Sequence, residues 1–214
     1  MVEPTPRSTP CWSYAQEGGA IVSVEPLNPE PDRLEPHRAG PFTFADLDAA
    51  PDDGTRRELI DGVLLVTPAP ALIHQRAALR IAAALDSVCP AEFEVVIAPY
   101  DYRPTAERSL QPDVLVLGSD ETNPAHAEKP LLLAVEVLSP RTHLVARLKR
   151  SAYEQAGVHS YWIVEPDEET LTVLELVDGL YVERDVVVGE KVFEATLPFP
   201  VQIVPAELTR SRRT

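Results

Sequence analysis

Two acidic residues interrupt otherwise apolar segments of the chain. Asp113 opens the segment PDVLVLG, and Glu136 stands inside LLLAVEVL. A carboxylate in a buried strand loses its hydration, which is unfavourable unless a partner compensates. Two such carboxylates on neighbouring strands also repel each other, and one divalent cation with oxygen ligands would relieve both effects. The pattern predicts a magnesium or manganese ion between Asp113 and Glu136. The alternative is that each acid lies at a strand end and is hydrogen-bonded or paired with an arginine.

The periodicity of the flanking residues predicts the elements that precede these acids. Residues 43–51, TFADLDAAP, predict a short helix with Thr43 as its N-cap. RELIDGVLLVTP predicts a strand pair that turns at Asp61–Gly62, a dipeptide favoured in tight hairpins. Residues 70–88 predict a longer helix. Its expected apolar stripe consists of Ile73, Ala77, Ile81, Ala84 and Val88.

Strands and one more helix are expected around and after the acids. The predicted strands are EFEVVIAP, PDVLVLG, LLLAVEVLS and SYWIVEP, with loops between the first three. A helix from His143 to Ala156, ended by Gly157, would join the last two strands by a right-handed crossover that makes them parallel. LTVLELVDGLYVERDVVV predicts a hairpin at Asp178–Gly179. The expected fold is α/β: a mixed sheet flanked by helices, with an appended antiparallel hairpin.

Length and composition set limits on the class of protein. A chain of 214 residues with 44% hydrophobic content can bury one good core and is short for two. It has no apolar run of membrane-spanning length and no basic-then-apolar start typical of a secretory signal. Cys11 and Cys89 are too few and too far apart for a disulfide framework or a zinc knuckle, which predicts a cytoplasmic protein.

The two ends of the chain differ from its middle. Residues 1–40 are rich in proline and predict a disordered or loosely draped tail. Trp12 and Tyr14 could dock elsewhere, but a tolerated N-terminal extension is the favoured interpretation. Residues 41–205 are the expected folded domain, and residues 206–214 a short basic tail. The net charge of −15 argues against a general DNA-coating role, because such proteins carry a basic face. It does not exclude an enzyme whose carboxylates hold metal ions.

Longer stretches of the chain resemble a known family. Pro112–Asp113, followed by Glu136-Val137-Leu138 on the next strand within a helix, three-strand, helix, strand order, resembles the PD-(D/E)XK nuclease superfamily. More narrowly, RELIDGVLLVTPAPALIHQ, QPDVLVL, VEVLSPRT and LKRSAYEQAGVHSYWIVEPDE resemble the Uma-two family of restriction-endonuclease-like proteins. The similarity covers about residues 42 to 190, and the block that begins at Glu136 is its most specific part.

The resemblance implies a restriction-endonuclease-like fold and a magnesium-dependent phosphodiester hydrolase. In such a site Asp113 and Glu136 would bind the metal, which polarises the phosphate and activates a water. Glu58 matches an acidic position of the family and could complete the metal cluster; the alternative is a solvated charge at a strand start. His74 matches another family position, where it could orient a carboxylate or contact phosphate. Its alternative is a histidine that caps or packs at the start of a helix.

The chain departs from the superfamily pattern in two places. The superfamily places a lysine two residues after the glutamate, and here that residue is Leu138. Lys149, on the following helix, matches the lysine typical of the Uma-two family and could reach the site; the alternative is an exposed helical lysine. Tyr153 lies one turn further on the same face, where it would support the site or pack. Between Thr142 and Lys149 the family usually has an acid, which is missing here.

Three hypotheses of function follow. The first is a metal-dependent endonuclease that acts on DNA, expected by analogy to be a homodimer because two strands need two sites. The second is a catalytically degenerate protein of the same fold that serves as a binding or assembly module; Leu138, the missing acid and the negative charge favour it. The third, a hydrolase of a small phosphorylated substrate, ranks last because none of the nine glycines forms a phosphate-binding loop.

Overall fold

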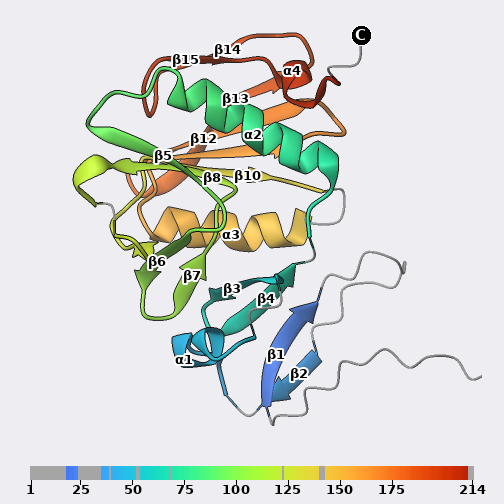
Figure 1. Cartoon of the computed structure of the whole chain (residues 1–214), viewed down its shortest axis with the longest axis vertical. Helices are drawn as coiled ribbons and strands as arrows, with labels where there is room; N and C mark the ends of the chain where they lie inside the picture. Colours follow the sequence, from blue (N-terminus) through green and yellow to red (C-terminus); the bar gives the residue numbers. More distant parts are fainter. Residues whose placement is uncertain are drawn as a thin grey trace, which may run out of the picture.

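The structure, a computed structural model, describes residues 18–23, 35–38, 40–51, 54–67, 69–121, 123–139 and 143–211. Within these ranges six strands form a central sheet in the order β13-β12-β11-β10-β8-β5. Their bounds are β5 (Phe93–Ile97), β8 (Val114–Gly118), β10 (Leu133–Val137), β11 (Ser160–Glu165), β12 (Thr170–Val177) and β13 (Leu180–Val188). The strands expected around Asp113 and Glu136 therefore lie side by side, and β10 and β11 are parallel as predicted. The chain is a mixed α/β protein (Figure 1).

Two helices cover opposite faces of the central sheet (Figure 1). On one face α2 (Leu72–Asp86) buries its apolar stripe, and on the other face α3 (His143–Gln155) joins β10 to β11. The predicted stripe of α2 is correct at Ala77 and Ile81 but wrong at Val88, which lies beyond the helix end and is 49% exposed. The residues that α2 buries are Ala77, Ala78, Ile81, Ala82 and Leu85.

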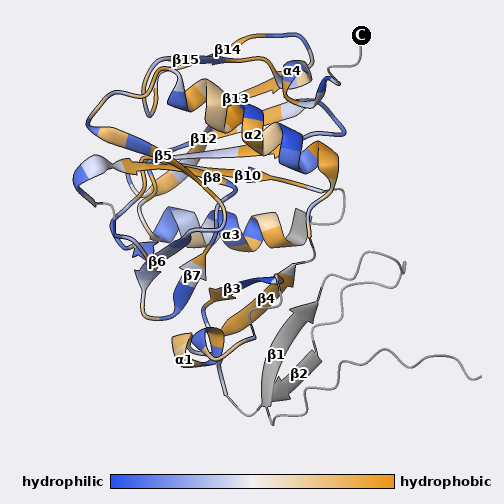
Figure 2. Ribbon diagram, in the orientation of Figure 1, coloured by the Kyte–Doolittle hydropathy of each residue, from blue (hydrophilic) through white to orange (hydrophobic). Residues whose placement is uncertain are grey.

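Alternation along β8 and β10 decides which side chains meet which helix. In β8, Val114 and Val116 belong to the core that contains α2, whereas Leu115 and Leu117 belong to the core that contains α3. Figure 2 shows both strands as predominantly hydrophobic, as expected for strands buried on both faces. In β10, Ala134 lies in the core on the α3 side. Glu136 is two residues further and therefore faces α3 as well.

A second sheet packs beyond α3 (Figure 1). In the described residues its order is β2-β1-β4-β3-β7-β6-β9. The bounds are β1 (Gly18–Ser23), β2 (Glu35–Arg38), β3 (Arg56–Ile60), β4 (Val63–Thr67), β6 (Asp101–Thr105), β7 (Arg108–Leu110) and β9 (His126–Ala127). β3 and β4 form the predicted hairpin: Asp61 and Gly62 adopt φ angles of 50° and 83°, which a tight turn of this kind requires.

The second sheet contains strands that the sequence patterns did not predict. Residues between β5 and β8, expected to form a loop, instead form the hairpin β6–β7, which pairs with β3. Part of the predicted N-terminal tail also differs from the expectation, since β1 pairs with β4 and β2 pairs with β1. The many prolines around these short strands favoured a tail over strands in the prediction. The rest of that tail, including Cys11, Trp12 and Tyr14, lies outside the described residues.

The C-terminal elements close the α2 side of the core. β14 (Phe193–Ala195) and β15 (Val201–Ile203) pair with each other, and α4 (Pro205–Thr209) follows. Leu208 is 4% exposed, so folded structure continues past the boundary expected at residue 205. Arg76 and Arg80 of α2 donate to main-chain oxygens of this segment. Residues 212–214 of the predicted basic tail lie outside the described residues.

Two short elements complete the fold. α1 (Phe44–Asp48) forms as predicted, and its N-cap Thr43 shares a capping box with Asp46. A single 3-10 turn, η1 (Ser119–Glu121), follows β8. No helix in the described ranges combines the length and apolar character that crossing a bilayer would require.

Candidate active site

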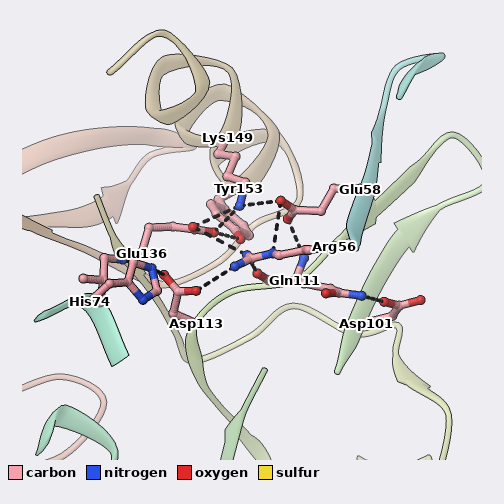
Figure 3. Close-up of polar contacts among 10 residues, drawn as sticks. Arg56, Glu58, His74, Asp101, Gln111, Asp113, Glu136, Lys149 and Tyr153 are labelled. Atoms are coloured by element: carbon pink, nitrogen blue, oxygen red, sulfur yellow. Dashed lines mark hydrogen bonds and ion pairs between the residues drawn. The ribbon is translucent and has the colours of Figure 1, made fainter. Parts of the chain in front are cut away.

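Asp113 and Glu136 face each other across the antiparallel pair of β8 and β10. Val135 is opposite Val114, so the next position along each strand sets Glu136 opposite Asp113. The main chain of Val137 donates a 2.7 Å hydrogen bond to Oδ2 of Asp113, which ties the carboxylate to the neighbouring strand. Both acids are buried, at 5% and 4% exposure. The two metal-binding candidates predicted from the sequence are therefore cross-strand neighbours (Figure 3).

The strand β3 brings Glu58 and Arg56 to the same place. They are two residues apart and so project from one face of the strand. Glu58 is fully buried, and its Oε1 accepts a 2.7 Å hydrogen bond from the main chain of Gln111. Arg56 points into the middle of the acids: its guanidinium nitrogens lie 2.7 Å from Asp113, 3.5 Å from Glu58 and 3.9 Å from Glu136. It also donates to the carbonyl of Gln111.

The helix α3 supplies Lys149 and Tyr153, one turn apart on the face that meets the sheet. Lys149 Nζ donates to both oxygens of Glu136 at 2.9 Å and forms an ion pair with Glu58 at 2.8 Å. The hydroxyl of Tyr153 donates to Oε1 of Glu136 at 2.6 Å. The Lys149 side chain is only 4% exposed, so the reading of an exposed helical lysine is wrong. Both side chains support Glu136.

His74 reaches the acids from the start of α2. Its Nε2 lies 3.2 Å from Oδ2 of Asp113, and the side chain is 15% exposed. Within the described part of the chain its Nδ1 is buried and has no hydrogen-bond partner. His74 therefore lies where it can orient a carboxylate, one of the two roles that the family resemblance implied for it.

Burial and charge act in opposite directions on the acids. Burial alone would raise the pKa of Asp113, but the hydrogen bond from His74 and the charge of Arg56 outweigh it and hold that pKa well below its usual range. Burial raises the pKa of Glu136; the charge of Lys149 opposes this rise, and nearby Asp113 adds to it. Burial lowers the pKa of Arg56, but the charges of the surrounding carboxylates raise it by more. The net pKa lies above the ordinary value, so the guanidinium stays charged.

All five site residues predicted from the sequence converge in the structure: Glu58, His74, Asp113, Glu136 and Lys149 (Figure 3). Arg56 and Gln111 were not predicted. The alternation of RRELI could have indicated Arg56, because a residue two positions before Glu58 shares its face. Leu138, which occupies the position of the superfamily lysine, is buried, and its main-chain nitrogen bonds Val164.

The donor chemistry of this group fits a hard divalent cation. Asp113, Glu136 and Glu58 offer carboxylate oxygens, the ligands that magnesium and manganese prefer. The arrangement of these carboxylates is not that of an assembled metal site. Among the described residues no three acidic, histidine or cysteine side chains are grouped so as to hold a metal directly. Instead, Arg56 and Lys149 lie between the carboxylates and form ion pairs with them. The oxygens that a metal would use are those that these two cations now contact.

Comparison with known proteins agrees with the motifs. The model of the Uma2 family, described as "Putative restriction endonuclease", matches residues 43–209. This chain belongs to the Uma2 family. The match includes β14, β15 and α4, which the motif resemblance had left out. No curated protein matches the chain.

A solved structure shares the fold. A putative nuclease belonging to DUF820 from Anabaena variabilis ATCC 29413 superimposes with a TM-score of 0.63 at 17% identity, over 79% of this chain and 98% of that chain. At this identity the likeness establishes the fold alone. A restriction-endonuclease-like fold is thus correct for the chain, and membership of the Uma2 family supports a nuclease, a hydrolase acting on phosphodiester bonds.

Proposed function

We propose that this Uma2 protein is a divalent-metal-dependent endonuclease that hydrolyses phosphodiester bonds in DNA. One observation carries the proposal: Asp113 directly before β8, Glu136 on β10 and Glu58 on β3 are all buried around Arg56 and Lys149. Burying three carboxylates in one place is unfavourable for stability alone. Such a cluster is typical of a site that has to gather negative oxygen ligands.

Asp113 and Glu136 would hold magnesium or manganese, with Glu58 as the third acid. The bound cation would supply Lewis-acid chemistry, polarising the phosphate and lowering the pKa of the attacking water. The protein residues orient these ligands. Tyr153 holds one oxygen of Glu136, and His74 with the main chain of Val137 holds one oxygen of Asp113. Such orientation is what keeps ligating carboxylates in a productive geometry.

Lys149 takes the role that the superfamily assigns to the lysine two residues after the glutamate. Its ammonium lies against Glu136 although it comes from α3 and not from β10. In hydrolysis, the oxygen of water forms a bond to phosphorus while the bond from phosphorus to the leaving sugar oxygen breaks. The proton of the water passes to solvent, and the leaving oxygen takes one up. A fixed positive charge beside the phosphate stabilises the negative charge that develops on its oxygens.

The test is cleavage of supercoiled plasmid by purified protein in magnesium or manganese, with and without a chelator. We compare the wild type with Asp113→Asn and Glu136→Gln, which retain side-chain size. Glu194→Gln is the matched control, because Glu194 is exposed on β14, far along the chain from the acid cluster. We expect metal-dependent nicking or linearisation by the wild type and the control, and a loss of about 100-fold or more in both cluster variants.

The second candidate is a protein of the same fold that binds without catalysis. It is favoured by the ion pairs of Arg56 with Asp113 and of Lys149 with Glu136, which already neutralise the acids, and by Leu138. A metal that binds only the folded protein raises its thermal stability. Absence of both plasmid cleavage and metal-dependent stabilisation would favour this candidate and exclude the enzyme.

The partners and location in the proposal follow from the substrate. A duplex has two strands, so we propose a homodimer that presents two such sites. We also propose a cytoplasmic location, as expected from the cysteine content, because an enzyme in that compartment has access to DNA. Sedimentation of the purified protein with and without a short duplex measures the oligomeric state.

A further inference from the structure

Arg56 is a charged residue of the site that neither the motifs nor the family resemblance singled out. Its guanidinium occupies the centre of the acid cluster, with nitrogens 2.7 Å from Asp113, 3.5 Å from Glu58 and 3.9 Å from Glu136 (Figure 3). These are the three carboxylates to which the proposed function gives the divalent cation. A guanidinium and a divalent cation cannot share one oxygen cluster without strong repulsion between them.

The oxygens of Asp113 show where the two would conflict. Oδ2 accepts from the main chain of Val137 and contacts His74, so it is bound to the fold. Oδ1 is held by Arg56. A cation that binds Asp113 from the side of Glu136 and Glu58 therefore has to take Oδ1 from Arg56.

Arg56 is also the more exposed of the two permanent cations of this site. Its side chain is 23% exposed, whereas that of Lys149 is 4% exposed. Lys149, on α3, lies between Glu58 and Glu136 and pairs with both. A guanidinium released toward solvent pairs well with phosphate oxygens, which in a nuclease are supplied by the substrate backbone.

We propose that Arg56 is an internal counter-ion that competes with the divalent cation for Asp113 and so sets the metal affinity of the site. This inference rests on the proposed function and adds its regulation. The wild-type site is expected to bind magnesium or manganese weakly, because each binding event has to displace Arg56. Removing the guanidinium should leave the carboxylates in place and open to the metal.

The experiment is calorimetric titration of the intact protein with manganese, comparing Arg56→Gln with the wild type. Arg57→Gln is the matched control: it removes the same charge from the adjacent residue of β3, which faces the opposite side of the strand. We expect the dissociation constant to fall by about tenfold or more in Arg56→Gln and to stay unchanged in Arg57→Gln. Adding Asp113→Asn to Arg56→Gln should abolish the gain.

The outcomes separate this inference from the proposed function. Equal affinity in the wild type and Arg56→Gln, or weaker affinity in Arg56→Gln, overturns the role of Arg56 and leaves a metal-binding nuclease. No binding by any variant overturns both. If circular dichroism shows that Arg56→Gln does not fold, Arg56→Met replaces it. That variant also removes the charge and keeps an apolar side chain of similar length, and an affinity no tighter than that of the wild type then refutes the competition.

Discussion

Lys149 Nζ lies 2.9 Å from each carboxylate oxygen of Glu136, although the two residues come from different elements. In the superfamily pattern the lysine follows the glutamate on the same strand, at the position of Leu138. The strand here contributes only the acid, and the ammonium arrives from the neighbouring helix. The lysine–glutamate pair is thus formed by a lysine at a different position in the sequence, because α3 lies across the face of the central sheet toward which Glu136 of β10 points (Figure 1).

Replacement of Lys149 by methionine should destabilise the fold as well as remove activity. The change removes the cation that lies closest to the buried Glu58 and Glu136, and loss of one partner of a buried pair costs about 3–5 kcal/mol. Urea unfolding measures it, with the exposed Lys191→Met as control. Adding Glu136→Gln to Lys149→Met should recover part of the loss. Equal stability of Lys149→Met and Lys191→Met would show that the ion pairs contribute nothing.

Replacement of Tyr153 by phenylalanine should cost about 1.5–3 kcal/mol, since it removes a 2.6 Å hydrogen bond to the buried carboxylate of Glu136. Tyr100→Phe is the matched control, because the Tyr100 hydroxyl donates to a main-chain oxygen, that of Asn123, in an exposed region. Thermal or urea unfolding of the two variants compares a charged acceptor with a neutral one. The expectation fails if Tyr100→Phe is as destabilising as Tyr153→Phe.

Replacement of glycine by alanine should destabilise the fold more at one hairpin turn than at the other. Gly62 and Gly179 have φ angles of 83° and 81°, so alanine is strained at both, by about 1–2 kcal/mol. A Cβ at Gly62 would also lie 2.4 Å from Cβ of Pro41, whereas at Gly179 no atom lies within 4 Å. Gly62→Ala should therefore cost about 1–3 kcal/mol more than Gly179→Ala in urea unfolding. Equal losses of unfolding free energy in the two variants would mean that the segment at Pro41 moves aside at no cost.

The buried tyrosines make the fold sensitive to alkali. Burial raises the pKa of Tyr102, Tyr153, Tyr161 and Tyr181 above the usual value of about 10. A raised pKa in the folded state contributes stability that is complete below about pH 10 and is lost as the pH rises further.

We expect tyrosinate absorbance from these four residues to appear only together with the loss of far-ultraviolet circular dichroism. Titration of the protein with alkali, followed by both signals, measures this. Ionisation of all six tyrosines near pH 10, about the value for a free tyrosine, while the circular dichroism stays native would contradict the burial of the four.

The predictable part of the structure is the part governed by local patterns. Nearly continuous apolar runs indicated β8 and β10, and Asp-Gly dipeptides indicated both hairpin turns, because only residues that tolerate positive φ fit there. The acids Asp113 and Glu136 were found because a charge in an apolar run is costly unless it has a partner. The family motifs then added Glu58, His74 and Lys149, which no local pattern would have grouped.

The unpredicted part depends on contacts between distant segments. The hairpin β6–β7 consists of short polar strands whose partners, above all β3, lie far away in the sequence, so no periodicity marks them. In the sequence Arg56 is one more charge in a polar stretch, and its role depends on β3 lying close to Asp113 at the start of β8. The motifs predicted a metal between the acids, where Arg56 now lies. An acid in an apolar run is conspicuous in the sequence, whereas the counter-ion that pairs with it is not.

The hydrogen bond from the main chain of Val137 to Asp113 has a consequence for how relatives of this protein are judged. One oxygen of that carboxylate locks the alignment of two core strands, so the aspartate contributes to folding whether or not any chemistry takes place. A descendant that abandoned catalysis would still be selected to retain it. Finding this aspartate in another genome therefore says little about activity there.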